Sequence, residues 1–88
     1  MEVAFDEVAL NDLKFWKKSG NAVVQKKIEK LILAIKETPY DGIGKPEALK
    51  HNLTGKWSRR IDKEHRIVYQ VVEEVVFIYS LRGHYDIK

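Results

Sequence analysis

The sequence predicts one α+β domain over residues 1–88, in which an N-terminal strand and a two-helix hairpin pack on an antiparallel β-sheet. Two observations carry this prediction. Apolar residues recur at helical spacing through the first half of the chain, and three runs rich in β-branched and aromatic residues follow in the second half. The composition favours a folded core, because 44% of the residues are hydrophobic and 10% are aromatic.

The first half of the chain is predicted to form a short strand and two helices. After a strand candidate at residues 3–5, Asp6 is a suitable N-cap for a helix that ends at Gly20. Asn21 can cap a second helix, which stops before Pro39 because the residue preceding a proline avoids the helical conformation. The tight turn between the two helices predicts that they run antiparallel.

The second half of the chain is predicted to form β-hairpins. Residues 38–46 have the composition of a loop, and residues 46–53 fit either a helical turn or a strand. Three strand-like runs follow at residues 57–61, 66–72 and 75–81. Because the links between these runs are short, we expect antiparallel pairing.

The last strand-like run places the candidate site. Odd-numbered positions of residues 75–81 are predicted to face the core, whereas the even-numbered positions become polar toward the C-terminus. A simple turn between the last two strands puts Arg66 on the face of Tyr85 rather than on the face of His84. A bulge or bend near Gly83 is needed to bring these side chains together.

Several classes of protein are excluded by composition. The chain has no cysteine, so it holds no disulfide, no thiol nucleophile and no thiolate zinc site. No apolar stretch approaches the roughly 20 residues of a membrane span, and the N-terminus lacks the features of a signal peptide. His51 and His65 lack metal-ligand spacing with each other or with His84. We therefore expect a cytoplasmic protein with no membrane association and no metal site.

The positive charge is concentrated in the second half of the chain. The formal net charge is +3, and residues 1–44 are balanced, so the whole excess lies in residues 45–88. Arginine suits phosphate because its planar fork makes two parallel hydrogen bonds. This pattern fits a polyanion-binding face and also fits an ordinary solvated strand surface, and charge alone slightly favours the latter.

The same half of the chain contains the groups that RNA cleavage by acid–base chemistry needs, namely a base, an acid and cations near the phosphate. Glu47 is an isolated acid in a basic stretch, although it also suits the start of a short helix. His84 is a proton carrier near neutral pH, although a histidine near a C-terminus is often a bystander. Arg66 and Tyr85 fit phosphate and base contacts, and equally fit surface and packing roles.

The arrangement of these residues resembles a known family. Residues 44–71 form the string GKPEALKHNLTGKWSRRIDKEHRIVYQV, and residues 81–85 form LRGHY. Together with the TPYDG loop, these segments closely resemble the YoeB (Txe/YoeB) toxins of bacterial type II toxin–antitoxin systems. The resemblance implies a RelE-like fold and a ribosome-dependent mRNA endoribonuclease, an mRNA interferase that cuts in the ribosomal A site.

The resemblance also implies roles for individual residues. Glu47 would be the general base, His84 the general acid and Arg66 the group that stabilises the scissile phosphate. The supporting residues would be Lys50 and Arg60, which bind phosphate, and Tyr85, which orients the substrate. The reaction would be attack by the 2′-oxygen on the adjacent phosphate, with no metal or organic cofactor. The implied partners are the ribosome and its mRNA, a second copy of the chain in a homodimer, and a YefM-like antitoxin.

Two departures from the family pattern leave other functions open. Asp86, Ile87 and Lys88 follow a His–Tyr pair that closes typical relatives, and Ala48 stands where a proline usually follows the glutamate. An acid at position 86 could tune His84. The alternative function is a non-catalytic RNA- or ribosome-binding translation blocker, which needs the basic face but neither Glu47 nor His84. A third is an antitoxin-binding relative that has lost its activity.

Overall fold

The structure is a computed structural model in which residues 1–83 are described. These residues form two α-helices, one 3-10 turn and five strands. In chain order these are β1 (Glu2–Phe5), α1 (Glu7–Ser19), α2 (Ala22–Glu37), β2 (Glu47–Ala48), η1 (His51–Leu53), β3 (Trp57–Arg60), β4 (Arg66–Val72) and β5 (Val75–Ser80). The predicted α+β class is confirmed.

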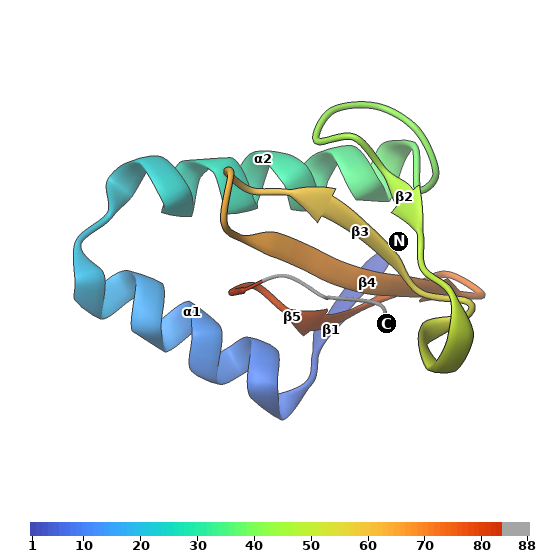
Figure 1. Ribbon diagram of the computed structural model, residues 1–88, viewed down its shortest axis with the longest axis horizontal. Coiled ribbons are helices and arrows are strands. Elements are labelled where there is room, and N and C mark those ends of the chain that lie inside the picture. The colour runs from blue at the N-terminus through green and yellow to red at the C-terminus, as the bar shows by residue number, and fades with distance from the viewer. Residues whose placement is uncertain (84–88) are drawn as a thin grey trace.

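Both helices begin and end where the capping residues predict. The side chain of Asp6 accepts a hydrogen bond from the Val8 N–H at 2.7 Å, and the side chain of Asn21 accepts one from the Val24 N–H at 3.1 Å. Between the helices, Gly20 has a φ of 70°, a left-handed conformation that costs glycine little. The helices meet at this turn and diverge into a V (Figure 1).

The five strands form a mixed sheet in the order β1-β5-β4-β3-β2. As predicted, β3 pairs with β4 and β4 with β5 in antiparallel fashion. The short strand β2 adds a further antiparallel pair with β3. The predicted sheet was purely antiparallel, and the N-terminal strand corrects this. β1 pairs parallel to β5, from Glu2 opposite Val75 to Phe5 opposite Ile78. Parallel pairing needs a long connection, and nearly the whole chain separates these two strands.

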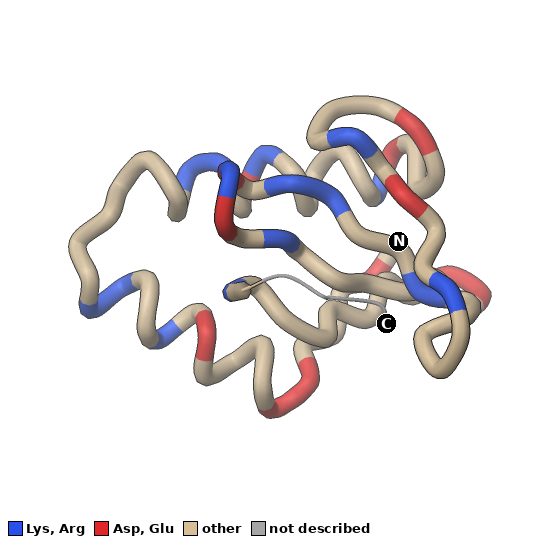
Figure 2. The backbone as a smooth tube through the Cα atoms, in the orientation of Figure 1, with Lys and Arg blue, Asp and Glu red and all other residues tan. Residues whose placement is uncertain are grey.

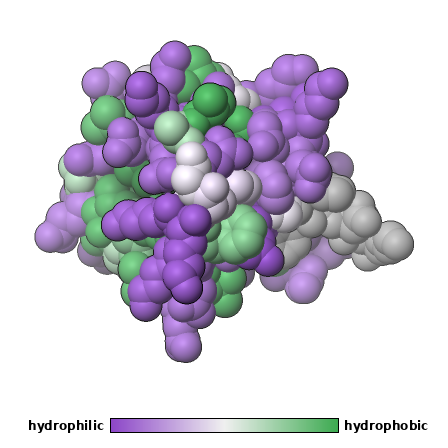
Figure 3. Space-filling model, turned by 90° about the vertical axis from the view of Figure 1, so that its left-hand side faces the viewer, coloured by the Kyte–Doolittle hydropathy of each residue, from purple (hydrophilic) through white to green (hydrophobic). Residues whose placement is uncertain are grey.

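The core lies between the helices and one face of the sheet. Four residues of α2 at helical spacing are buried, namely Val24, Ile28, Leu31 and Ile35. They pack with Trp16 of α1 and with buried sheet residues that include Ile67, Tyr69 and Ile78. Viewed from the end where the helices meet, hydrophobic side chains interrupt a mostly hydrophilic surface (Figure 3).

The prediction for the two faces of the last strand was wrong for residues 75–79 and correct for Leu81, which is fully buried in the core. Val76 and Ile78 are fully buried, whereas the odd-numbered Val75 and Phe77 are only partly buried. The pairing of β1 and β4 with β5 explains the reversal, because Val76 lies opposite Val71 and Ile78 lies opposite the buried Tyr69. An alternation of apolar residues on both faces gives no sign of which face meets the helices.

The ambiguous segment before the sheet contains both of the predicted alternatives. A two-residue strand, β2, comes first and pairs Glu47 with Ser58. A 3-10 turn follows at His51–Leu53. Within residues 1–83, neither helix is long and apolar enough to cross a lipid bilayer.

We predict that burial on α2 decides the effect of identical substitutions. Leu31 is fully buried and Leu33 is 62% exposed on the same helix. Leu31→Ala should lower the free energy of unfolding by about 2–5 kcal/mol, because it removes buried methyl groups and leaves a cavity. Leu33→Ala should change it by less than about 0.5 kcal/mol. Urea unfolding of both variants measures the difference, and equal losses would contradict this packing of α2.

Candidate active site

The sheet has one face that the helices do not cover, which we call the open face. Since Ile67 and Tyr69 of β4 belong to the core, the side chains that alternate with them point the other way. One row of paired residues crosses four strands on this face, consisting of Glu47 and the buried residues Ser58, Val68 and Ser80. Glu47 is exposed at the end of this row, where a ligand can reach its carboxylate.

Two arginines lie next to that row on the open face. Arg60 of β3 pairs directly with Arg66 of β4, and like charges placed opposite each other in a sheet are destabilising. The Nη1 atom of Arg66 is buried and has no hydrogen-bond partner within residues 1–83. A buried donor without an acceptor costs free energy. An anion between the two guanidinium groups would relieve both costs.

Other cations extend this arrangement. Figure 2 shows Arg along β3 and at the start of β4, with both basic and acidic residues in the turn between them, and acidic Glu47 belongs to the neighbouring strand β2. Lys50 is exposed and caps the 3-10 turn, three residues after Glu47. The structure therefore brings Glu47, Arg60 and Arg66 onto one face, with Lys50 nearby in the chain.

The sequence did not predict a cluster of three contacting side chains on this face, Tyr79, Gln70 and Lys56. Tyr79, which we expected in the core, donates a hydrogen bond from its hydroxyl to Gln70 Oε1 at 2.9 Å, and the Nζ atom of Lys56 lies 4.5 Å from its ring centroid. The register explains this placement. Tyr69 lies opposite Ile78 but Val68 lies opposite Ser80, so Tyr79 is an extra residue in β5, which is a β-bulge.

The end of the described chain turns toward Arg66. The sequence left open whether a bulge or bend near Gly83 brings Arg66, His84 and Tyr85 together. The structure has a bulge earlier, at Tyr79, and Gly83 itself has a left-handed φ of 77°. The Gly83 carbonyl accepts a hydrogen bond from the Arg66 N–H at 2.8 Å. The candidates His84 and Tyr85 follow directly in the sequence and lie outside the described residues.

Arg59, one of the cations in the predicted basic stretch, does not belong to the open face. It alternates with Arg60 and is fully buried on the opposite side of β3. Its guanidinium donates four hydrogen bonds, to the Tyr69 hydroxyl and to the backbone carbonyls of Thr38, Asp41 and Ile43. Within residues 1–83 it forms no ion pair with a carboxylate. Arg59 therefore fastens the loop before β2 to the sheet.

Tyr69 completes this buried contact. Its hydroxyl donates to the Pro39 carbonyl at 2.6 Å and accepts from Arg59 Nε at 3.1 Å. Burial raises the pKa of the Tyr69 hydroxyl above its ordinary value of 10.0, while the hydrogen bond and the charge of Arg59 lower it and Tyr40 adds a smaller upward effect. The loop that Arg59 and Tyr69 hold leads directly into β2, so this contact positions the strand that carries Glu47.

Arg82 and His65 contact aromatic residues of α1. The Arg82 guanidinium lies 3.9 Å from the ring centroid of Phe15 on α1, so it stacks against that helix. His65 packs edge-to-face on Trp16, and His51 is exposed in the 3-10 turn. In the described part of the chain, no three His, Asp or Glu side chains form a group that could hold a metal ion.

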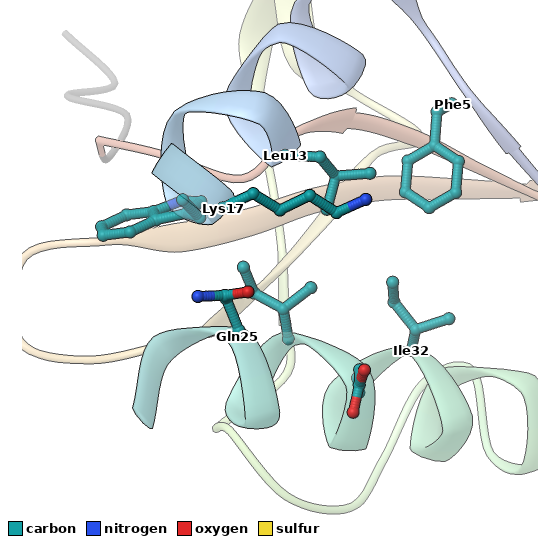
Figure 4. Close-up of a pocket in the computed structure, with 8 residues that line it drawn as sticks. Phe5, Leu13, Lys17, Gln25 and Ile32 are labelled. Atoms are coloured by element: carbon teal, nitrogen blue, oxygen red, sulfur yellow. The ribbon is translucent and has the colours of Figure 1, made fainter. Parts of the chain in front are cut away.

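A pocket of about 250 Å³ lies away from the open face, between the two helices. Figure 4 shows Phe5, Leu13 and Ile32 pointing into it, with the Lys17 side chain extended along one wall and Gln25 on another. Trp16 and Ile28, which belong to the core, complete the lining. This apolar pocket is on the helix side of the sheet and contains none of the candidate site residues.

Comparison with known proteins decides the family. Residues 5–85 match the family described as the YoeB-like toxin of bacterial type II toxin–antitoxin systems. The chain belongs to this YoeB-like toxin family. The toxin YoeB of Escherichia coli strain K12 is 45% identical over 85 residues, which cover 97% of this chain and all of the relative. The toxin YoeB of Synechocystis is 47% identical over 86 residues, covering 98% of this chain and 99% of the relative.

Solved structures of YoeB proteins also superpose closely on this YoeB-like toxin. A YoeB/ParE toxin from Agrobacterium tumefaciens has a TM-score of 0.92 at 39% identity, covering 97% of this chain and all of that one. The YoeB dimer from Staphylococcus aureus has a TM-score of 0.89 at 41% identity, covering 97% and 98% of the two chains. The YafQ toxin of Escherichia coli, at 12% identity and a TM-score of 0.78, shares the fold alone, over 94% of this chain and 92% of that one.

We predict that the buried guanidinium of Arg59 cannot be replaced by another cation. Arg59→Lys should lower the free energy of unfolding by on the order of 3 kcal/mol, because an ammonium group cannot reach all four acceptors and leaves buried oxygens unpaired. The matched control Arg60→Lys, on the exposed side of the same strand, should change it by less than about 0.5 kcal/mol. Chemical denaturation measures both. An Arg59→Lys variant with the stability of the wild type would mean that the loop is held by other contacts.

We also predict a pH effect from Tyr69. In the unfolded chain this phenol loses its proton near about pH 10, whereas the folded protein keeps the proton to higher pH because burial raises the pKa of the hydroxyl. The unfolded state then binds fewer protons, so the free energy of unfolding should fall as the pH rises above about 10. Tyr69→Phe should show a shallower fall when unfolding is measured across this range. If the free energy of unfolding fell equally steeply with pH in the two proteins, Tyr69 would not be the cause of the pH effect.

Proposed function

We propose that this toxin is a ribosome-dependent mRNA endoribonuclease that cuts mRNA in the ribosomal A site and so stops translation. YoeB toxins as a family are ribosome-dependent mRNA interferases. For this chain the proposal rests on one observation. The open face combines the carboxylate of Glu47 with the Arg60–Arg66 pair, and Arg66 Nη1 is a buried donor without a partner within residues 1–83. A phosphate oxygen of RNA is a suitable acceptor for that donor.

The proposed reaction is a transfer of the phosphate from the 5′-oxygen to the 2′-oxygen of the preceding nucleotide. Glu47 takes the proton of the 2′-hydroxyl while the 2′-oxygen forms its bond to phosphorus. The bond between phosphorus and the 5′-oxygen breaks, and His84 donates a proton to that leaving oxygen. The products are a 2′,3′-cyclic phosphate and a 5′-hydroxyl, so one proton is taken and one is given in each cleavage.

The cations of the open face have a separate role in this reaction. Negative charge builds up on the phosphate oxygens as the fifth bond to phosphorus forms, and donors fixed in advance stabilise that charge without reorganising. Arg66, held on a central strand, is the proposed stabiliser of the scissile phosphate. Arg60 and Lys50 would bind phosphate oxygens beside it, and Tyr85 would orient the substrate next to His84. No metal or organic cofactor is part of this proposal.

The proposed partners follow from the solved relatives. The Staphylococcus aureus YoeB protein is known as a dimer and in complex with YefM, which supports a homodimer and a YefM-like antitoxin for this chain. A disordered antitoxin segment that carries acidic residues would fold against the basic open face. The proposed substrate, mRNA on a translating ribosome, assigns the toxin to the cytoplasm.

The alternative is a translation blocker that binds ribosomal or other RNA without cutting it. Such a protein would use Arg60, Arg66 and Lys50 in the same way, but it would not need Glu47 or His84. Substitutions that remove only the proton-transfer groups therefore separate the two functions.

We predict that Glu47→Gln slows mRNA cleavage on programmed ribosomes by about 10²- to 10⁴-fold, because the amide cannot accept the 2′-hydroxyl proton. Cleavage is measured under single turnover with mapping of the new 5′ ends, and naked mRNA is the substrate control. The matched control is Glu37→Gln, an exposed acid at the end of α2, which should cleave at the wild-type rate.

Two further comparisons decide between the enzyme and the blocker. His84→Gln should lose cleavage to a similar extent while ribosome binding stays within a few-fold of the wild type. Wild-type protein that binds ribosomes and leaves the A-site codon intact would support the blocker. A Glu47→Gln variant that cuts at the wild-type rate would exclude Glu47 as the general base.

A further inference from the structure

The last described segment of the chain, residues 81–83, is fastened on two sides. On the helix side, α1 holds the backbone of Leu81. The Asp12 carboxylate accepts a hydrogen bond from the Leu81 N–H at 2.9 Å, and the Trp16 indole Nε1 donates one to the Leu81 carbonyl at 2.9 Å. The N–H and the carbonyl of Leu81 are therefore both bound by side chains of α1.

On the sheet side, the same segment is held at Gly83. His65 Nδ1 accepts a hydrogen bond from the Gly83 N–H at 2.8 Å, and the Gly83 carbonyl accepts one from the Arg66 N–H at 2.8 Å. The next residue in the chain is His84, the proposed general acid. The two bonds at Gly83 thus fasten the last described residue of the chain to the start of β4, the strand that carries Arg66.

The His65 ring is set between the two sides of this arrangement. It packs edge-to-face on Trp16, with ring centroids 4.9 Å apart and an interplanar angle of 84°. Its side chain is 18% exposed, and its Nε2 lies 3.7 Å from Glu64 Oε2. Because Nδ1 accepts the bond from Gly83, that nitrogen carries no proton, and the neutral ring holds its proton on Nε2.

We propose that His65 is a positioning residue for the cleavage reaction, which holds Gly83 through an unprotonated Nδ1 and releases it when the imidazole gains a second proton. A doubly protonated imidazole has two donors and no acceptor, so it cannot accept the Gly83 N–H. Histidine as a residue type changes its charge between about pH 5 and 8, so this is the range over which the proposal is tested. The inference rests on the proposed function, because it acts through His84.

Charged residues lie on every element next to His65. Asp62 accepts backbone hydrogen bonds from Glu64 and His65 within the β3–β4 turn. The charged residues of these elements are Asp62, Lys63 and Glu64 in the turn, Arg66 at the start of β4, Asp12 on α1, which bonds to Leu81, and Arg82 in the C-terminal segment.

Two substitutions separate the acceptor from the ring. His65→Asn places an amide oxygen at about the position of Nδ1, so it keeps an acceptor that does not titrate. His65→Phe keeps an aromatic ring against Trp16 and removes the acceptor. A purely structural role of the ring would favour the phenylalanine, whereas the proposed role favours the asparagine.

The first measurement is the cleavage rate of the full-length toxin on programmed ribosomes from about pH 5.5 to 8, spanning the histidine range. At the upper end, His65→Phe should be roughly five- to tenfold slower than wild type, the equivalent of one neutral hydrogen bond, and His65→Asn should be within about twofold. At the lower end, the wild type should lose rate relative to His65→Asn. Equal rates for both variants, or equal pH profiles for wild type and His65→Asn, would overturn the proposal.

The second measurement does not depend on activity. In ¹⁵N NMR spectra of the purified toxin, the Gly83 amide resonance should move clearly further with pH in the wild type than in His65→Asn across the same range, since His84 contributes equally to both. A toxin that shows this movement but cuts no mRNA would refute the proposed function and leave the His65–Gly83 contact standing. A Gly83 amide that moves equally with pH in the wild type and in His65→Asn, in an active toxin, would refute the positioning role alone. Should His65→Phe fail to fold, the comparison of wild type with His65→Asn still decides.

Discussion

The buried positive charge of Arg59 is the constraint on which the arrangement of this protein depends. Removing a guanidinium from water costs several kcal/mol unless its donors are satisfied. Here the acceptors are a tyrosine hydroxyl and three carbonyls of the loop before β2, so the loop must close on the sheet for the charge to be tolerated. Gly44, at a φ of 84°, allows this closure, since a Cβ there would lie 2.7 Å from Leu31.

Alternation along β3 couples this constraint to the proposed site. Arg59 points into the protein and fastens the loop, while Arg60 points to the open face and pairs with Arg66. The loop then delivers Glu47 to the edge of the same sheet, opposite Ser58. Within residues 1–83, the like-charged pair and an Arg66 donor that has no hydrogen-bond partner are both unfavourable. Such local conflicts are typical of binding sites, where the ligand supplies the missing partner.

The sequence predicted the parts of the fold that local chemistry determines. The caps at Asp6 and Asn21 and the left-handed Gly20 set the helices correctly, because each acts within its own turn. The predicted burial of the two faces of β5 was wrong before Leu81, because the bulge at Tyr79 and the pairing with β1 depend on distant strands. Nor does the sequence distinguish Arg59 from Arg60. The site residues came from the family resemblance, and the structure adds that Glu47, Arg60 and Arg66 share one face of the sheet.

The central claim is that the open face cuts RNA by using a 2′-hydroxyl of the RNA as the attacking group. The most direct test is cleavage of an mRNA that has one 2′-deoxynucleotide at the position that supplies this oxygen. Programmed ribosomes present this mRNA and its unmodified counterpart to the toxin. The account predicts that the deoxy substitution abolishes the cut at that bond and that the unmodified mRNA yields a cyclic phosphate and a 5′-hydroxyl. Cleavage of the deoxy mRNA at the same bond and rate would contradict it, because water and not the 2′-oxygen would then be the attacking group.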